Sequence, residues 1–107
     1  MRIAVVSAGP YWSSDLAGVF GRSPYILFFD TETGSTQSLA NPGAESTGGA
    51  GPEAAQFVLS QGAEVLVAPK VGPKAHKVLE AAGVRFVFRK GGASGAALAE
   101  ARREEPA

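Results

Sequence analysis

Two short, uninterrupted apolar runs, Ile3–Val6 and Val65–Ala68, constrain the fold of this chain more than any other feature. Neither alternates apolar and polar positions, and both are rich in β-branched residues, which is typical of strands buried on both faces of a sheet. The sequence therefore predicts an α/β fold in which helices cover the sheet. A chain of 107 residues is long enough for one such core and short for two domains.

The rest of the chain predicts three more strands and three helices. Tyr25–Asp30 is rich in aromatic and branched residues, and the turn-like Thr31–Gly34 joins it to a polar segment, as in a β-hairpin. Pro52 suits the first position of a helix, and Gly62 and Gly83 suit the left-handed caps that end helices. In chain order we expect strands at 3–6, 25–30 and 35–39, a loop over 41–51, a helix from Pro52, a strand at 65–68, a helix from Gly72-Pro73, a strand at 84–88, and a helix capped by Ser94 and ending near Arg103.

This order, β-β-β-α-β-α-β-α, predicts an antiparallel hairpin followed by two βα units in one mixed sheet. A ribonuclease-H-like three-layer fold, with a five-stranded sheet and helices packed on it, fits the order best. We expect one domain over residues 1–103 and a frayed, charged tail over residues 104–107.

Several apolar side chains near the ends of these elements are also expected to be buried. Ala82 continues the apolar face of the second helix at helical spacing. Phe86 and Phe88 are expected in the core of the last strand. Tyr11 and Trp12 are expected to be buried over the end of the sheet, and the competing interpretation gives them a role as a lid or in docking a partner.

Charge and composition exclude several classes of function. The formal net charge is zero, so the basic excess of a nucleic-acid binder is missing and we expect no nucleic-acid partner. No apolar run approaches the roughly 20 residues that span a bilayer, and the first apolar run is too short for a signal peptide, so we expect a cytoplasmic protein with no membrane partner. The absence of cysteine excludes disulfides and cysteine-ligated iron–sulfur clusters from this chain alone.

Four motifs follow one another along the chain: Phe20-Gly21-Arg22-Ser23-Pro24-Tyr25, Asn41-Pro42, Thr47-Gly48-Gly49-Ala50-Gly51 and Gly72-Pro73-Lys74-Ala75. Each alone marks only a loop. In this order and spacing they resemble the dinitrogenase iron-molybdenum cofactor biosynthesis family, which includes NifX-type proteins and the C-terminal domain of NifB-type cofactor synthases. The resemblance covers roughly residues 1 to 101, with Lys74 in place of the family's usual asparagine.

The resemblance implies a ribonuclease-H-like domain that carries or inserts iron–sulfur or iron–molybdenum cofactor intermediates. We expect this domain not to be an enzyme. Cluster-binding relatives tend to have histidine at the place of Val19 and, in some members, at that of Arg22. Valine offers no ligand and a guanidinium stays protonated, so this chain departs from the family at those two positions.

The topology itself predicts a binding edge. Parallel strands bring the segments 7–19, 41–51, 69–72 and 89–93 to one end of the sheet, where the helices also begin. Helix N-termini carry partial positive charge and free N–H groups, and nearby Arg22, Lys70 and Lys90 add full charges, so a small anion is the expected ligand. The candidate binding residues are Phe20, Gly21, Arg22, Ser23, Gly48, Gly49, Gly51, Lys70 and Gly72. In the competing interpretation, these glycines and prolines only build tight loops and caps.

His76, the only histidine, is a candidate metal ligand because it lies one turn from its helix start; the competing interpretation places it on a solvated flank. A ribonuclease-H-type nuclease needs converging acids, and the first strand has none. Three functions stay open: a carrier of an anionic metal cluster or other small anion, a protein-interaction or regulatory module that has lost the ligand, and an enzyme acting on a small anionic substrate.

Overall fold

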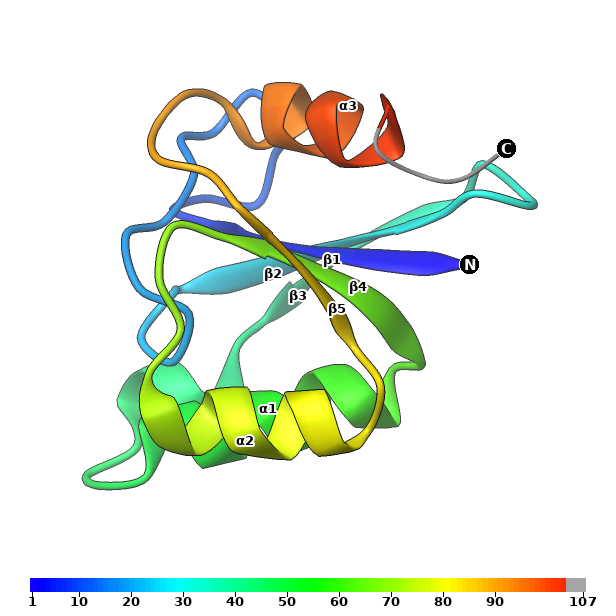
Figure 1. Cartoon of the computed structure of the whole chain (residues 1–107). Helices are drawn as coiled ribbons and strands as arrows, with labels where there is room; N and C mark the ends of the chain where they lie inside the picture. The colour runs from blue at the N-terminus through cyan, green and yellow to red at the C-terminus, as the bar shows by residue number, and fades with distance from the viewer. Residues whose placement is uncertain (104–107) are drawn as a thin grey trace.

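A five-stranded mixed sheet lies between two helical layers in the computed structural model, which describes residues 1–103 (Figure 1). The elements are β1 (Arg2–Ser7), β2 (Tyr25–Asp30), β3 (Thr36–Ala40), the 3-10 helix η1 (Pro42–Glu45), α1 (Ala50–Ser60), β4 (Ala63–Ala68), α2 (Pro73–Ala81), β5 (Arg85–Phe88) and α3 (Ser94–Arg103). The predicted tail at 104–107 lies outside the described residues.

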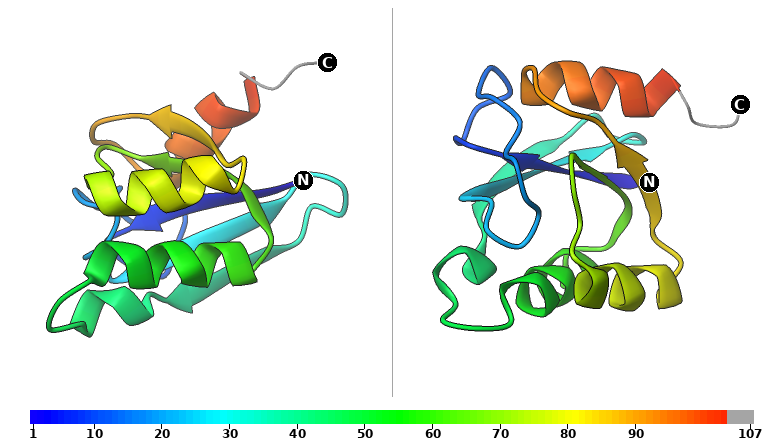
Figure 2. Two further views of the ribbon diagram at one scale, coloured as in Figure 1. Left: turned by 60° about the horizontal axis from the view of Figure 1, so that its bottom comes forward. Right: turned by 60° about the vertical axis from the view of Figure 1, so that its left-hand side comes forward.

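The strand order is β3-β2-β1-β4-β5, with β2 antiparallel to both of its neighbours and β1, β4 and β5 parallel. α1 and α2 lie side by side on one face of the sheet, and α3 covers the other face (Figure 2). The predicted α/β three-layer fold with a mixed five-stranded sheet is confirmed. No helix in the described part of the chain is long and apolar enough to cross a membrane.

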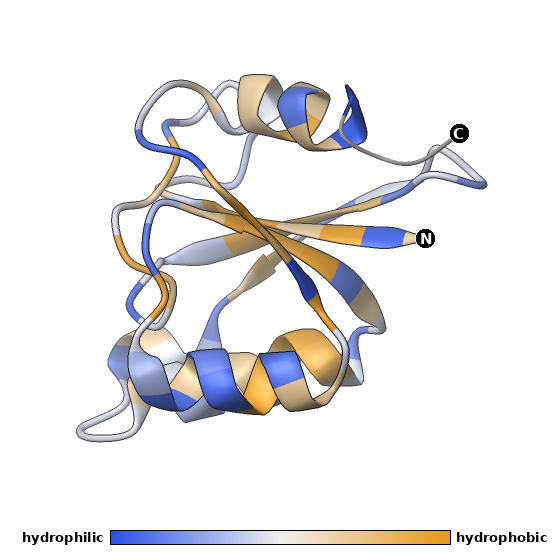
Figure 3. Cartoon of the chain, viewed as in Figure 1, coloured by the Kyte–Doolittle hydropathy of each residue, from blue (hydrophilic) through white to orange (hydrophobic). Residues whose placement is uncertain are grey.

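The core is centred on β1, the middle strand. Ile3–Val6 are fully buried, as are Ala54, Ala55 and Val58 of α1 on one face and Ala97 and Ala101 of α3 on the other. Alanine on the inner helix faces lets the helices approach the sheet closely. Within residues 1–103 no charged side chain is buried, and the ribbon of the sheet is mostly apolar (Figure 3). Burying one large side chain such as Phe28 stabilises the fold by about 1.5–3 kcal/mol.

The predicted loop over 41–51 contains more structure than the sequence suggested. η1 begins after Asn41, whose side-chain oxygen accepts a hydrogen bond from the N–H of Gly43. α1 begins at Ala50, after Gly49 in the left-handed region with φ 73°, so Pro52 is its third residue and not its first. Proline is tolerated there because first-turn N–H groups have no intrahelical acceptor.

The prediction that Phe88 belongs to the core is wrong, whereas Phe86 is half-buried and packs against the core. β5 is one of the two edge strands of the sheet, and 56% of the Phe88 surface is exposed. Ala82 is also exposed, because α2 ends at Ala81. Tyr11 is 69% exposed, contrary to expectation, whereas the half-buried Trp12 packs against the core.

Ser94 does not cap α3 with its hydroxyl. It is the first residue of that helix and is fully buried. Its hydroxyl donates to Ser7 Oγ at 2.9 Å and lies 3.0 Å from the carbonyl oxygen of Ser14. The residue thus ties the start of α3 to the end of β1 and to the loop that follows.

Candidate anion site at the loop end of the sheet

The loops predicted to share one end of the sheet do meet there. The N–H of Phe20 donates to the carbonyl of Lys70 at 3.1 Å, and that of Leu16 donates to Gly92 at 2.8 Å. These bonds join the segment before β2 to the loops after β4 and β5. The end of the sheet from which the helices start is therefore a continuous, hydrogen-bonded surface.

Close backbone contacts explain the glycine of the Phe20–Tyr25 motif. A β-carbon on Gly21 would lie 2.8 Å from the nitrogen of Gly51, and one on Gly43 would lie 2.5 Å from the carbonyl oxygen of Ala50. A β-carbon does not come this close to a non-bonded backbone atom, so both glycines are needed for the segment before β2 and η1 to pack on the first turn of α1.

Asn41 holds the same segment from the other side. Its buried amide nitrogen donates to the carbonyls of Gly21 at 3.2 Å and Ser23 at 2.9 Å. Ser23, itself buried, donates its hydroxyl to the carbonyl of Phe20, whose ring is fully buried. Phe20, Gly21 and Ser23 thus support the loop end structurally.

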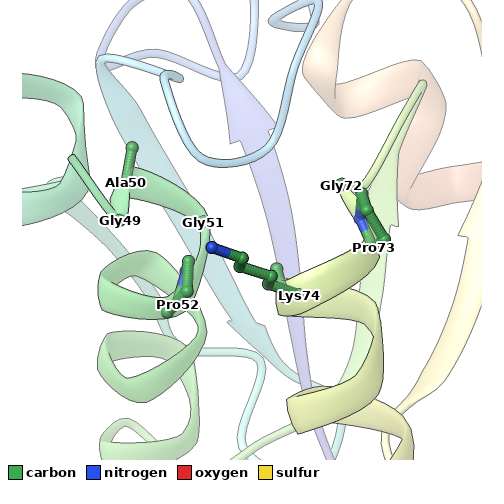
Figure 4. A pocket seen from close by; sticks show the side chains of 8 residues that line it. Gly49, Ala50, Gly51, Pro52, Gly72, Pro73 and Lys74 are labelled. Carbon is green, nitrogen blue, oxygen red and sulfur yellow. The ribbon is translucent and has the colours of Figure 1, made fainter.

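A pocket of about 350 Å³ opens between the first turns of α1 and α2 (Figure 4). It is lined by Gly49, Ala50, Gly51, Pro52, Gly72, Pro73, Lys74 and Ala75. The helices approach closely here, since a β-carbon on Gly51 would lie 3.3 Å from Cβ of Ala75. Three of the predicted candidates, Gly49, Gly51 and Gly72, line this pocket.

The pocket combines three sources of positive potential. Two helix N-termini face it, and first-turn N–H groups have no intrahelical acceptor. The Lys74 side chain extends from α2 toward α1, with its ammonium group beside Gly51 and Pro52 (Figure 4). The acid in the first turn of α1, Glu53, is exposed and does not line the pocket.

The other predicted candidates lie outside the pocket lining. The guanidinium of Arg22 donates to the carbonyls of Ala44 at 3.2 Å and Ser46 at 2.6 Å, so it braces η1 and the loop after it. Gly48 and Lys70 are exposed. The ring of His76 stacks on Phe86, with centroids 4.4 Å apart.

Sequence reasoning did not select Lys74 as a binding residue. The available signal was its place directly after Gly72-Pro73, in the first turn of a helix that starts at the loop end.

A second hollow has a volume of about 470 Å³ and is lined by Pro24, Tyr25, Ala40, Asn41, Pro42, Ala44 and Glu45. Its charged group is the carboxylate of Glu45, so this hollow does not suit an anion.

The residues of the pocket do not fit a cluster that is bound through metal–ligand bonds. Iron–sulfur clusters are held by thiolates, and the chain has no cysteine. No three histidine, aspartate or glutamate side chains converge within residues 1–103 to form a metal site. The pocket fits an anion that is held by N–H groups and one ammonium group.

Comparisons with known proteins agree with the resemblance seen in the motifs. A sequence model described as dinitrogenase iron-molybdenum cofactor matches residues 1–104. The NMR structure of a Thermotoga protein assigned as a NifB protein of the DUF35 family is 34% identical, covers 96% of this chain and 88% of its own, and has a TM-score of 0.84. The apo form of the orange protein from Desulfovibrio gigas is 33% identical over 95% of this chain and 85% of its own, also with a TM-score of 0.84. No curated protein matches the sequence. The chain therefore belongs to the dinitrogenase iron-molybdenum cofactor family.

Proposed function

We propose that this chain is a small, non-enzymatic carrier that holds an anionic iron–sulfur or iron–molybdenum cluster, or a related small anion, in the pocket between α1 and α2. The cluster is cargo, held by hydrogen bonds and charge. The observation that carries the proposal is the convergence of two helix N-termini and the Lys74 ammonium on one pocket. Family membership supplies the class of cargo.

Gly72 gives independent support. Its φ of −65° and ψ of 159° are extended values that any residue adopts, and a β-carbon there would meet no heavy atom within 4 Å. Neither conformation nor packing within the chain requires glycine at this position. The missing side chain leaves the rim of the pocket open, which lets a ligand approach the backbone of α2.

The size and chemistry of the pocket favour a carrier over an enzyme. Its volume of about 350 Å³ is at the lower end of the roughly 300–1,000 Å³ of small-molecule sites, enough for an anion of many atoms. Lys74 is the ionisable side chain among the lining residues. General acid–base catalysis needs a positioned donor and acceptor near the working pH, and this lining provides no such pair.

An NMR titration with molybdate as the probe tests the proposal. We expect amide shifts confined to the first turns of α1 and α2, and a loss of affinity of about 10- to 100-fold in Lys74→Gln, because one charge-assisted hydrogen bond is worth about 1.5–3 kcal/mol. Lys77→Gln is the matched control, since Lys77 is an exposed lysine of the same helix outside the pocket lining. Amide shifts in other parts of the protein, or an equal loss of molybdate affinity in Lys74→Gln and Lys77→Gln, would contradict a specific site in this pocket.

The second candidate function is a protein-interaction or regulatory module of the same fold. The large exposed surface of Phe88 on the outermost strand favours it. As first stated, this module has lost the ligand, but protein binding at β5 does not by itself require that loss, because β5 and the pocket use different residues.

A further inference from the structure

Three aromatic rings form a row along the β5 side of α2. His76 stacks on Phe86 with centroids 4.4 Å apart and ring planes at 5°, and Phe86 stacks on Phe88 at 5.7 Å and 1°. The row ends in Phe88, 56% of which is exposed. Aromatic side chains, phenylalanine included, are enriched at protein–protein interfaces relative to the rest of the surface.

The row lies beside a free sheet edge. β5 ends the strand order, so its outer backbone N–H and C=O groups face no further strand among residues 1–103. Such an edge can accept an added strand from another chain. The register of β5 on β4 is regular from Arg85 to Phe88, so the strand presents an undistorted edge.

Charge is distributed unevenly along the chain, although the net charge is zero. Residues 30–69 contain five acids and no lysine or arginine, whereas residues 70–90 contain six lysines or arginines and one acid, Glu80. Residues 70–90 include α2 and β5, so the aromatic row lies in this basic segment. Lys77 and Lys90 are exposed there, and Arg89 is paired with Glu100 of α3 at 2.9 Å.

We propose that the β5 edge binds an acidic, extended segment of a partner protein, which adds a sixth strand beside β5 and covers Phe88. Backbone hydrogen bonds hold the segment, Phe88 anchors an apolar side chain, and the lysines attract acidic residues. This docking does not depend on the anion pocket. Because β5 has only four residues, much of the affinity comes from Phe88 and from charge.

Two other occupants fit the surface less well. A single-stranded nucleic acid needs several ring faces free for base stacking, and Phe88 is the one ring of the row that is largely exposed. A second copy would have to bring its acidic segment, residues 30–69, against this basic edge. Such a contact is head-to-tail, so it would produce rings or open-ended filaments and not a symmetric dimer.

A displayed library of random ten-residue peptides tests the proposal. Peptides are selected for binding to the wild-type protein, and those that also bind Phe88→Ser are removed. Because Phe88 is largely exposed, we expect the variant to fold, and circular dichroism verifies this. We expect enriched peptides in which acidic and apolar residues alternate, with at least tenfold weaker binding to Phe88→Ser and weaker binding to Lys77→Gln. Tyr11→Ser, which removes another exposed aromatic, is the matched control and should bind as the wild type does.

The mapping of the enriched peptide decides the mode of binding. We expect its amide shifts and exchange protection to lie on Arg85–Phe88. Failure to enrich any peptide, enrichment of neutral or basic peptides, or equal binding by Phe88→Ser overturns the proposal. So does Phe88-dependent binding of a labelled oligothymidine, or Phe88-dependent self-association in sedimentation.

Discussion

Replacing Gly21 by alanine tests whether the glycine of the Phe20–Tyr25 motif is there for packing. The new β-carbon would lie 2.8 Å from the nitrogen and 2.9 Å from the α-carbon of Gly51, both of them backbone atoms of α1. A flexible side chain could move away, but here the start of α1 or the segment before β2 has to shift. Overpacking of this kind costs about 1–3 kcal/mol.

Gly72→Ala is the matched control, because both glycines belong to motifs at the same end of the sheet. The methyl group meets nothing within 4 Å, and the backbone is already extended. Alanine is a poorer N-cap than glycine, whereas losing a glycine reduces the entropy of the unfolded chain, which stabilises the fold by about 0.4–1 kcal/mol. These effects oppose each other, so the free energy of unfolding should stay within about 1 kcal/mol of the parent value.

Thermal and urea unfolding followed by circular dichroism measure both variants. For a domain of this size 1 kcal/mol shifts the melting temperature by about 4–8 °C, so Gly21→Ala should melt about 5–20 °C below the parent protein. A Gly21→Ala protein as stable as the parent would refute the close-packing argument. If Gly72→Ala lost as much stability as Gly21→Ala, the fold itself would require glycine at position 72. Gly72 would then no longer support an anion pocket.

Three further predictions concern side chains outside the pocket. Asn41→Ala leaves the N–H of Gly43 and two carbonyls without their buried partner. Urea unfolding should therefore show a free energy of unfolding about 1–3 kcal/mol lower than that of the parent protein. A smaller decrease would mean that water replaces the amide. The backbone N–H of Glu32 donates to the Asp30 carboxylate and holds its pKa below the ordinary value of 3.8. The carboxylate therefore stabilises the fold at pH values above 3.8, and this stabilisation is lost as the pH falls through the lower pKa of the folded protein. Melting temperatures of the parent should therefore fall relative to those of Asp30→Asn in acid, and a pH-independent difference would contradict this. Arg22→Ala should speed amide hydrogen exchange in η1 and the loop after it but leave molybdate binding unchanged. If molybdate binding were lost while exchange in the loop stayed the same, Arg22 would be a binding residue.

Local sequence patterns account for much of the fold. Uninterrupted apolar runs identified β1 and β4, and Gly62 and Gly83 do adopt the left-handed conformation expected after helices, with φ of 78° and 84°. Such features depend on neighbouring residues in the chain, so sequence suffices to find them. Phe88 could not be placed, because an apolar strand looks the same whether or not another strand lies beside it.

The candidate site was predictable in location but not in composition. Parallel strands fix the end of the sheet where the helices begin, and Gly49, Gly51 and Gly72 do line a pocket there. The direction of a long side chain depends on tertiary contacts instead. Arg22 reaches the carbonyls after η1, whereas Lys74 reaches across to α1, and no local pattern distinguishes these two outcomes.

Anaerobic reconstitution of the purified protein with iron, sulfide and molybdate tests the carrier role most directly. After desalting, metal analysis and visible absorption are compared for the parent, Lys74→Gln and Lys77→Gln. We predict stoichiometric metal and a charge-transfer band in the parent and in Lys77→Gln, and a loss of both in Lys74→Gln. A colourless, metal-free parent protein, or metal retained equally by all three, would contradict a cluster held in the pocket between α1 and α2.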